Sequence, residues 1–326
     1  MKAVMIDELG LPPVCRQIPD VQPSDGHEIA RVRAAAIKNI ERMLVAGTHY
    51  ASTQLSLPAQ VGMDAVAELI DGRRVYAGAI PPGGTMAEHM LVDPSMTVPV
   101  PDDVDDASAA ALPNAGVSAW LSLEHTGQLR SGQSVLVLGA TGVTGALAVQ
   151  LAKHKFAAGH VVAVGRNRNR LEALTEAGAD RTIGIMDDPG RLRSAIAKAH
   201  TDHPFDLVLD HLWGEPAEQA LRALSGDDLA AAYHRTRFVQ IGEMAGHSIT
   251  LAASTLRSAG TELLGQGGGS ISPEVFGRVT TEIIPELFDM LARRTLTIDT
   301  ATHPIEDVRS VWNQTMPSGT RAVLVP

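Results

Sequence analysis

The sequence of 326 residues contains a single cysteine, Cys15. No disulfide bond can therefore form within the chain, which favours a reducing compartment. A structural zinc site built from cysteine thiolates is excluded, because such a site needs several of them. Long apolar runs are also lacking, since none reaches the roughly 18–20 residues that cross a bilayer. The opening stretch "MKAVMIDELGLPP" lacks the apolar core and cleavage site of a signal peptide. We expect a cytoplasmic protein without a membrane-spanning segment.

An excess of basic residues is absent as well. The chain has 27 Lys and Arg against 37 Asp and Glu, a formal net charge of −10. Non-specific binding to nucleic acid requires a basic surface that displaces counterions, so this balance argues against a nucleic-acid partner. It does not exclude a small anionic ligand, because one local basic patch would bind it. The length favours two domains rather than one core.

Two patterns divide the chain. The first hundred residues contain short β-prone runs separated by turn signals such as "PSDG" and "PPGG", which predict a small, mostly antiparallel β domain. From Ser134 onward the apolar runs alternate with helix-length segments; these runs are "SVLVLG", "HVVAVG", "RTIGI", "FDLVLD", "RFVQIG" and "TELLGQ". Apolar strands separated by helices indicate a doubly wound α/β fold, a parallel sheet covered on both faces that binds nucleotides. We expect the last run, "RAVLVP", to return to the first domain, which gives domains at 1–110 with 266–326 and at 111–265.

A glycine-rich turn follows the first strand of the α/β pattern. The run Ala140-Thr141-Gly142-Val143-Thr144-Gly145 fits the dinucleotide-binding pattern with Ala in place of its first Gly. Gly142 would let the backbone approach a pyrophosphate, Gly145 would let the helix pack closely on the sheet, and the N–H groups of Val143 and Thr144 would point at phosphate oxygens. Glycines also simply end strands, but this turn follows a strand, opens a helix and begins the alternation, which favours the cofactor interpretation.

Arginines follow the second strand of that pattern. An acidic residue here would accept hydrogen bonds from the ribose 2′-OH of NAD, but the chain continues from Gly165 with Arg166, Arg168 and Arg170. A guanidinium would hold the 2′-phosphate that a carboxylate repels. We therefore expect NADP(H), with Arg166 as the main ligand and Arg170 as a second one. The alternative, a solvated basic start of a helix, stays open, above all for Arg168.

These features together resemble the medium-chain dehydrogenase/reductase superfamily, in particular its zinc-independent quinone oxidoreductase (zeta-crystallin-like) branch. The resemblance covers nearly the whole chain, through "TMAEHMLVD", "AAALPNAGVSAWLSL", "VLVLGATGVTGALAVQLAK", "AGAD", "FDLVLD" and "RFVQIGEM" in this order. It implies a GroES-like substrate domain, a Rossmann cofactor domain and hydride transfer from NADPH to a quinone or an α,β-unsaturated carbonyl. Homodimers are common in the family.

The resemblance also bears on metals and on the catalytic residues. Zinc-dependent relatives use a Cys, a His and a further Cys or acid, whereas "AAIKNIERMLVAGTHY" offers no first ligand, so we expect no metal. Related proteins carry an Asn-x-x-Asp stretch followed by Gly and Tyr; the match here is Lys38-Asn39-Ile40-Glu41 and Gly47-Thr48-His49-Tyr50, which departs from it. Asn39 and Tyr50 are the candidate donors to the acceptor oxygen, with His49 as the alternative to Tyr50.

Further cofactor contacts are implied in the same way. They are Ser118 near the nicotinamide, Ile241 and Gly242 after the fifth strand, Gly267 after the sixth, and Arg321 near the end of the sequence. Two other functions stay open at this point. One is an NADPH-binding sensor or interaction protein with little turnover, and the other is a secondary-alcohol dehydrogenase.

Overall fold

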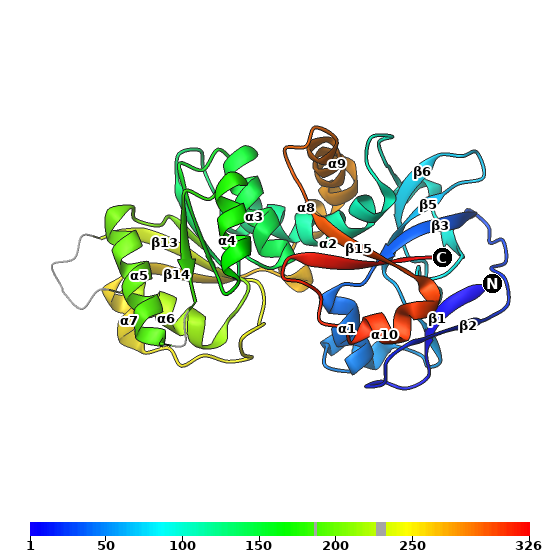
Figure 1. The fold of residues 1–326 in the computed structure, drawn as a ribbon, viewed down its shortest axis with the longest axis horizontal. Helices are drawn as coiled ribbons and strands as arrows, with labels where there is room; N and C mark the ends of the chain where they lie inside the picture. The colour runs from blue at the N-terminus through cyan, green and yellow to red at the C-terminus, as the bar shows by residue number, and fades with distance from the viewer. Residues whose placement is uncertain (186–187, 226–232) are drawn as a thin grey trace. The chain divides into compact units, whose positions relative to one another are not determined.

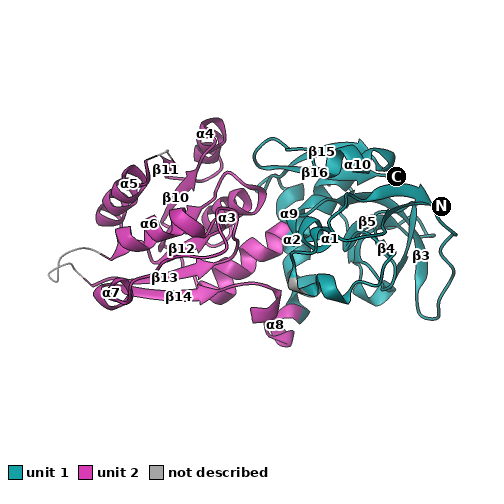
Figure 2. Cartoon of the chain, turned by 90° about the horizontal axis from the view of Figure 1, so that it is seen from below, with its two compact units in different colours: residues 1–114, 277–326 teal, residues 115–276 magenta. Residues whose placement is uncertain are grey.

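The computed structural model describes residues 1–185, 188–225 and 233–326. The chain forms two compact units, which Figure 2 distinguishes by colour. Unit 1 comprises Met1–Asn114 and Gly277–Pro326, and unit 2 comprises Ala115–Phe276. Both transitions fall inside helices, in α2 (Asp106–Leu121) and in α8 (Pro273–Arg278). Among the helices of these described ranges, none is long and apolar enough to cross a membrane.

Unit 2 is built on a parallel sheet with the strand order β11-β10-β9-β12-β13-β14. Its strands are β9 (Ser134–Leu138), β10 (His160–Gly165), β11 (Arg181–Gly184), β12 (Leu207–Asp210), β13 (Arg235–Gln240) and β14 (Gly260–Gly265). In order of appearance along the chain this is 3-2-1-4-5-6, the Rossmann-like arrangement, in which the strand order reverses beside the first strand. The α/β fold class that the alternating apolar runs predict is confirmed.

Helices cover both faces of this sheet, as Figure 1 shows. They are α3 (Val143–His154), α4 (Arg168–Glu176), α5 (Pro189–Asp202), α6 (Gly214–Leu224) and α7 (Ala253–Ser258). Leu136 and Leu138 of β9 lie on the face where α5 and α6 pack, whereas Val135 and Val137 point to the other face. All four are fully buried. Burial on both faces explains why this strand is apolar throughout and does not alternate.

Unit 1 contains two sheets. A three-stranded sheet joins β2 (Val14–Gln17), β1 (Lys2–Ile6) and β4 (Ala59–Gln60). The larger sheet has the order β15-β16-β3-β5-β6-β8, with β7 also paired to β3. Its strands are β3 (Glu28–Ala36), β5 (Asp64–Glu68), β6 (Arg74–Gly78), β7 (His89–Val92), β8 (Val98–Pro99), β15 (Asp299–Pro304) and β16 (Thr320–Val325). All its pairs are antiparallel except β15 with β16, so the predicted, mostly antiparallel β region is confirmed.

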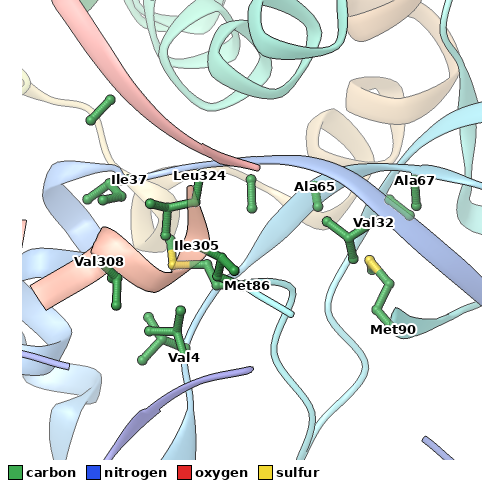
Figure 3. Packing of buried hydrophobic residues seen from close by; sticks show 14 of the residues in the cluster. Val4, Val32, Ile37, Ala65, Ala67, Met86, Met90, Ile305, Val308 and Leu324 are labelled. Carbon is green, nitrogen blue, oxygen red and sulfur yellow. The ribbon is translucent and has the colours of Figure 1, made fainter. Parts of the chain in front are cut away.

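The core of unit 1 draws on both ends of the sequence. Strand β16 pairs with β3 through Val323 opposite Ala36 and Leu324 opposite Ala35. Figure 3 shows Leu324, with Ile305 and Val308 from the same late segment, beside Val4, Ile37 and Met86. The helical elements around this core are α1 (Asn39–Ala46), η1 (Tyr50–Gln54), η2 (Pro94–Met96), α9 (Ile284–Ala292), η6 (Ile305–Asp307) and α10 (Val308–Trp312).

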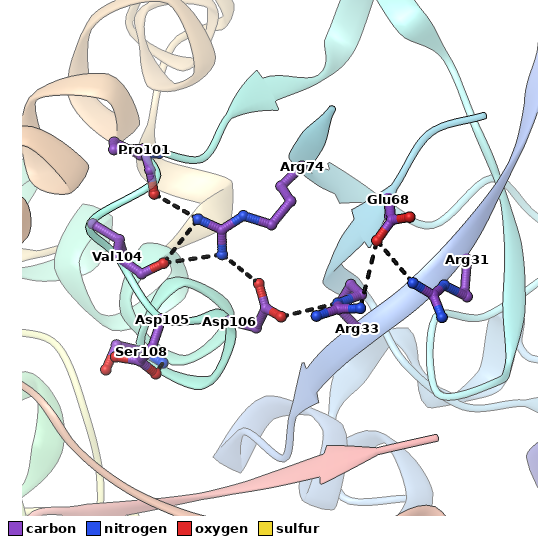
Figure 4. A network of polar contacts seen from close by, with 9 residues as sticks. All are labelled: Arg31, Arg33, Glu68, Arg74, Pro101, Val104, Asp105, Asp106 and Ser108. Carbon is purple, nitrogen blue, oxygen red and sulfur yellow. Dashed lines mark hydrogen bonds and ion pairs between the residues drawn. The ribbon is translucent and has the colours of Figure 1, made fainter. Parts of the chain in front are cut away.

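A chain of ion pairs fixes the start of α2 on the larger sheet (Figure 4). Asp106 accepts hydrogen bonds from Arg74 Nη1 at 2.7 Å and from Arg33 Nε at 3.0 Å. Glu68 then pairs with Arg33 at 3.5 Å and with Arg31 at 2.9 Å. The side chain of Asp105 also accepts from Ser108 N at 2.9 Å, which satisfies a donor of the first turn. Carboxylates at this end also interact favourably with the helix dipole.

The segment "SPEVFGRVTTEIIPELFDMLARRTL" is mostly helical, with one irregularity. The run consists of α8, a π-helical turn η5 (Val279–Ile283) and α9. Pro285 near the start of α9 has no backbone N–H to donate to the preceding turn. The wider π turn just before it accommodates that missing hydrogen bond.

Candidate cofactor-binding site

The carboxyl end of β9 closes into a tight turn. Gly139 has φ of +82°, a conformation that glycine adopts without strain. Gly139 N and Ala140 N both donate to Val164 O of β10 at 2.9 Å, and Gly142 N donates to Gly139 O at 3.1 Å. Gly142 caps the start of α3. The first-turn N–H groups of α3, which belong to Val143, Thr144 and Gly145, have no acceptor within the helix, so the turn presents donors suited to an anion.

Two glycines of this region are required by close packing. A side chain at Gly145 would place its Cβ 2.3 Å from Gly139 O, so only glycine lets α3 start directly on the strand end. At Gly165 a Cβ would lie 2.4 Å from Thr141 Cγ2. The structure therefore brings together Thr141 and Gly165, which are separated in the sequence, and the buried Thr141 side chain covers the end of β10.

The arginines follow the end of β10. Asn167 caps α4, and its side chain accepts a hydrogen bond from Arg170 N at 3.1 Å. Arg166 and Arg168 are exposed, and no carboxylate of the described ranges forms an ion pair with either. Arg170 is partly buried. A guanidinium without an ion-pair partner, directly after a strand at the carboxyl edge of the sheet, is suited to bind an anionic group of a ligand.

The remaining candidates of unit 2 lie on three further segments. Ile241 N and Gly242 N donate to Asp210 O at 2.8 and 3.2 Å, which ties the end of β13 to the end of β12. Gly267 follows β14 and is exposed, and a Cβ there would meet nothing within 4 Å. Ser118 is partly buried on α2. Gly242 and Gly267 thus stand at the carboxyl edge of the sheet, where open α/β sheets bind ligands.

Sequence reasoning missed the polar group at the end of β12. The Asp210 carboxylate is buried and accepts hydrogen bonds from Leu212 N at 2.9 Å and Trp213 N at 3.0 Å. Burial raises the pKa of Asp210 to about 6 against the lowering effect of these bonds, and burial lowers the pKa of His211 to about 4. Trp213 has φ of +55° and packs against the core under α5 and α6. An acid at the end of a buried strand is the signal that could have found this group.

Three candidates lie in unit 1. Asn39 is exposed at the first position of α1. Tyr50 begins η1, and its side chain lies outside the described part of the structure. His49, the alternative to Tyr50, caps η1 by accepting a hydrogen bond from Ala51 N at 3.2 Å. Arg321 on β16 is only 8% exposed, and its Nη1 donates to Ile37 O at 3.4 Å.

Lys38 and Glu41, which depart from the family pattern, form a buried ion cluster. Lys38 Nζ lies 3.0 Å from Glu41 Oε1 and 2.9 Å from Asp64 Oδ1, and it donates to Ala36 O at 3.2 Å. Glu41 also accepts from Lys38 N at 2.8 Å and from Met63 N at 3.0 Å. Burial lowers the pKa of Lys38, but the charges of Asp64 and Glu41 outweigh that effect and raise it. The i,i+3 spacing of Lys38 and Glu41 hinted at this pair, whereas nothing in the sequence pointed to Asp64.

Across residues 1–185, 188–225 and 233–326, no group of three or more His, Cys, Asp or Glu side chains is placed to hold a metal ion.

Comparisons with known proteins identify similar sequences and a similar fold. Residues 143–256 match the family model described as zinc-binding dehydrogenase. The chain is 26% identical to a probable NADPH-dependent quinone reductase of Emericella nidulans, over all of both chains. It is also 26% identical to mouse prostaglandin reductase-3, over 74% of this chain and 62% of the mouse protein's length. The crystal structure of the quinone oxidoreductase from Thermus thermophilus, also solved with NADPH, superimposes with a TM-score of 0.79 at 26% identity and covers all of both chains.

Proposed function

Because this chain belongs to the medium-chain dehydrogenase/reductase superfamily, in its quinone oxidoreductase branch, we propose that it transfers hydride from NADPH to a quinone or an α,β-unsaturated carbonyl. The observation that carries the choice of cofactor is Arg166, exposed and without an ion-pair partner in the described ranges, directly after β10. The reaction of this proposal uses no zinc. The proposal includes a cytoplasmic location, which the sequence composition favours, and a homodimer, which the family resemblance implies.

The residues of unit 2 would hold the cofactor. The first-turn N–H groups of Val143 and Thr144 would donate to the pyrophosphate, whose charge the start of α3 stabilises. Arg166 and Arg170 would bind the 2′-phosphate through charge-assisted hydrogen bonds. Bound NADPH supplies the hydride, and Ser118, Ile241, Gly242 and Gly267 would border its nicotinamide half.

The residues of unit 1 would act on the acceptor. Asn39, at the start of α1, and Tyr50 would donate hydrogen bonds to the acceptor oxygen and stabilise the negative charge that develops there. Arg321 would contribute positive charge toward the cofactor. The hydride needs no acid for its transfer, because holding the two reactants in contact supplies much of the rate and solvent can supply the proton.

The direct test is a titration of NADPH and NADH against the wild type and Arg166→Ala. Loss of one charged pair to phosphate should weaken NADPH binding by about 1–3 kcal/mol, roughly tenfold or more, and leave NADH binding unchanged. Arg168→Ala is the matched control, because Arg168 is exposed on the same segment. Equal weak binding of both cofactors, unaffected by Arg166→Ala, would refute the assignment. Tight NADPH binding without turnover across a panel of quinones and enones would favour a sensor.

A further inference from the structure

A chain of hydrogen bonds, buried at Ser122 and Gln266 and partly buried at Gln240, joins three segments of unit 2 that are far apart in the sequence. Ser122 is fully buried, and its Oγ lies 2.7 Å from Ser118 O and 3.0 Å from Gln266 Oε1. Gln266 is 7% exposed, and its backbone N donates to Gln240 O at 2.9 Å. The side chain of Gln240 in turn donates from Nε2 to Gly242 O at 3.1 Å. One polar path thus runs from α2 through the end of β14 to the end of β13.

The local structure around this path is specialised. Ser122 begins a π-helical turn, η3 (Ser122–Thr126), which directly continues α2. π turns are rare and occur frequently at functional sites. Gly127 closes this turn with a bond from its N to Ser122 O at 2.9 Å, and a Cβ on Gly127 would lie 2.5 Å from that oxygen. The turn is therefore held in place on its far side, which leaves Ser122 fixed to meet Gln266.

Glycines lie on both sides of Gln266, and the packing of the protein does not require glycine at these positions. A Cβ at Gly265, Gly267, Gly268 or Gly269 would meet nothing within 4 Å, and none of them has a positive φ. Neither packing nor backbone conformation explains four glycines here. Close approach of a ligand to the backbone is the remaining physical use of glycine at such a place. Gln266 is the one side chain of this run that turns into the protein and ties it down.

We infer that Gln266, through Ser122, is a positioning residue that holds the strand-end backbone against the nicotinamide half of the cofactor. This inference rests on the proposed function, because it takes Ser118, Gly242 and Gly267 as neighbours of the nicotinamide. The chain of hydrogen bonds fixes these neighbours relative to one another, and its central bond between Ser122 and Gln266 is buried, where hydrogen bonds are strong because water is excluded. The adenosine half, held at Arg166 after β10, contacts none of these bonds. Loss of the path would misplace the hydride donor without releasing the cofactor's other end.

The test uses the full-length protein with Gln266→Met, Ser122→Ala, the double variant and the control Gln133→Met. Gln133 lies before β9, where its Oε1 accepts a hydrogen bond from Arg130 N at 2.8 Å. For each protein we would measure the Kd of adenosine 2′,5′-bisphosphate, the Kd of NADPH, and the single-turnover rate of NADPH oxidation by 9,10-phenanthrenequinone. The bisphosphate probes the adenosine half alone.

Gln266→Met should keep the bisphosphate Kd within twofold, weaken NADPH severalfold and slow hydride transfer about tenfold or more. The double variant should be no slower than the slower single variant, because both substitutions remove the same path. Gln133→Met should match the wild type. A transfer rate within twofold of wild type in Gln266→Met, or equal weakening of bisphosphate and NADPH, would overturn the inference. Absence of bisphosphate binding by the wild type would instead remove the proposed function, and the inference with it.

Discussion

Replacement of Lys38 by methionine probes the most deeply buried charge of unit 1. The side chain of Lys38 is completely inaccessible, and its ammonium lies within hydrogen-bond distance of two carboxylates, 3.0 Å from Glu41 and 2.9 Å from Asp64. Methionine has a similar length and volume, so Lys38→Met removes the charge and keeps the packing. Glu41 and Asp64, 2% and 9% exposed, would then face each other without their shared cation.

The expected destabilisation at pH 7.5 is about 3–5 kcal/mol, since removal of one partner leaves buried charge uncompensated. The matched control is Arg73→Met, because Arg73 belongs to the same unit and pairs at 2.7 Å with Asp71 but is 64% exposed. Such a surface pair contributes about 0.2–1 kcal/mol, so the control should change the stability by no more than that. Burial also favours neutral carboxyls once the ammonium is gone. The folded variant should therefore take up protons as the pH falls. Its loss of unfolding free energy relative to the wild type should shrink toward pH 5.

The assay is urea unfolding followed by the fluorescence of Trp312, which is buried in unit 1. Trp120 and Trp213 belong to unit 2 and would be replaced by phenylalanine in every protein compared, so that the signal reports unit 1 alone. A second variant adds Glu41→Gln and Asp64→Asn to Lys38→Met, and it should recover part of the loss because it removes the two buried carboxylates that Lys38→Met leaves without their ammonium. A loss below about 1 kcal/mol for Lys38→Met at pH 7.5 would refute the reasoning, since it falls within the range of surface pairs. A loss independent of pH would refute the role of the carboxylates.

Two further predictions concern unit 2. Burial lowers the pKa of both His200 and His211 to about 4, with a smaller contribution from His234 at His200. Below about pH 6.5 the unfolded chain therefore binds more protons than the folded chain does. From pH 7.5 to 5.5 each histidine should lower the free energy of unfolding by about 1.3 kcal/mol. Asp210 should raise it by about 0.8 kcal/mol over the same range, because its raised pKa lets the folded state take up a proton first. Urea unfolding at both pH values should show a smaller loss for His211→Asn than for the wild type; an unchanged loss would contradict the assignment. Gly145→Ala should destabilise unit 2 by about 1–3 kcal/mol and weaken NADPH binding, because the added Cβ would overlap Gly139 O. The control Gly184→Ala should do neither, because a Cβ there meets nothing within 4 Å. Thermal unfolding and NADPH titration of the two variants measure this, and equal behaviour would count against the packing argument.

Local sequence patterns were enough to predict the parallel sheet and the glycine-rich turn at its carboxyl edge. Apolar runs such as "SVLVLG" and "HVVAVG", with helix-length segments between them, specify a sheet buried on both faces, and the strand order follows the doubly wound pattern. The turn at Gly142 and Gly145 could also be predicted from the sequence, because tight turns and close packing require glycine at fixed spacing. These features are local, so neighbouring residues carry enough information to predict them.

The pairing of distant polar groups, by contrast, depends on the complete fold. Asp64 joins Lys38 and Glu41 across the sheet of unit 1, Gln266 meets Ser122 across 144 positions, and Arg321 reaches Ile37 across 284. In the sequence Lys38 and Glu41 read as departures from a family pattern, and Gln266 as an ordinary residue in a glycine-rich run. A hydrogen bond between distant segments depends on strand order, register and helix placement together, and hydrophobic periodicity specifies none of these partners. Buried polar groups must nevertheless be paired, so the completed fold selects the partner that the local pattern leaves open.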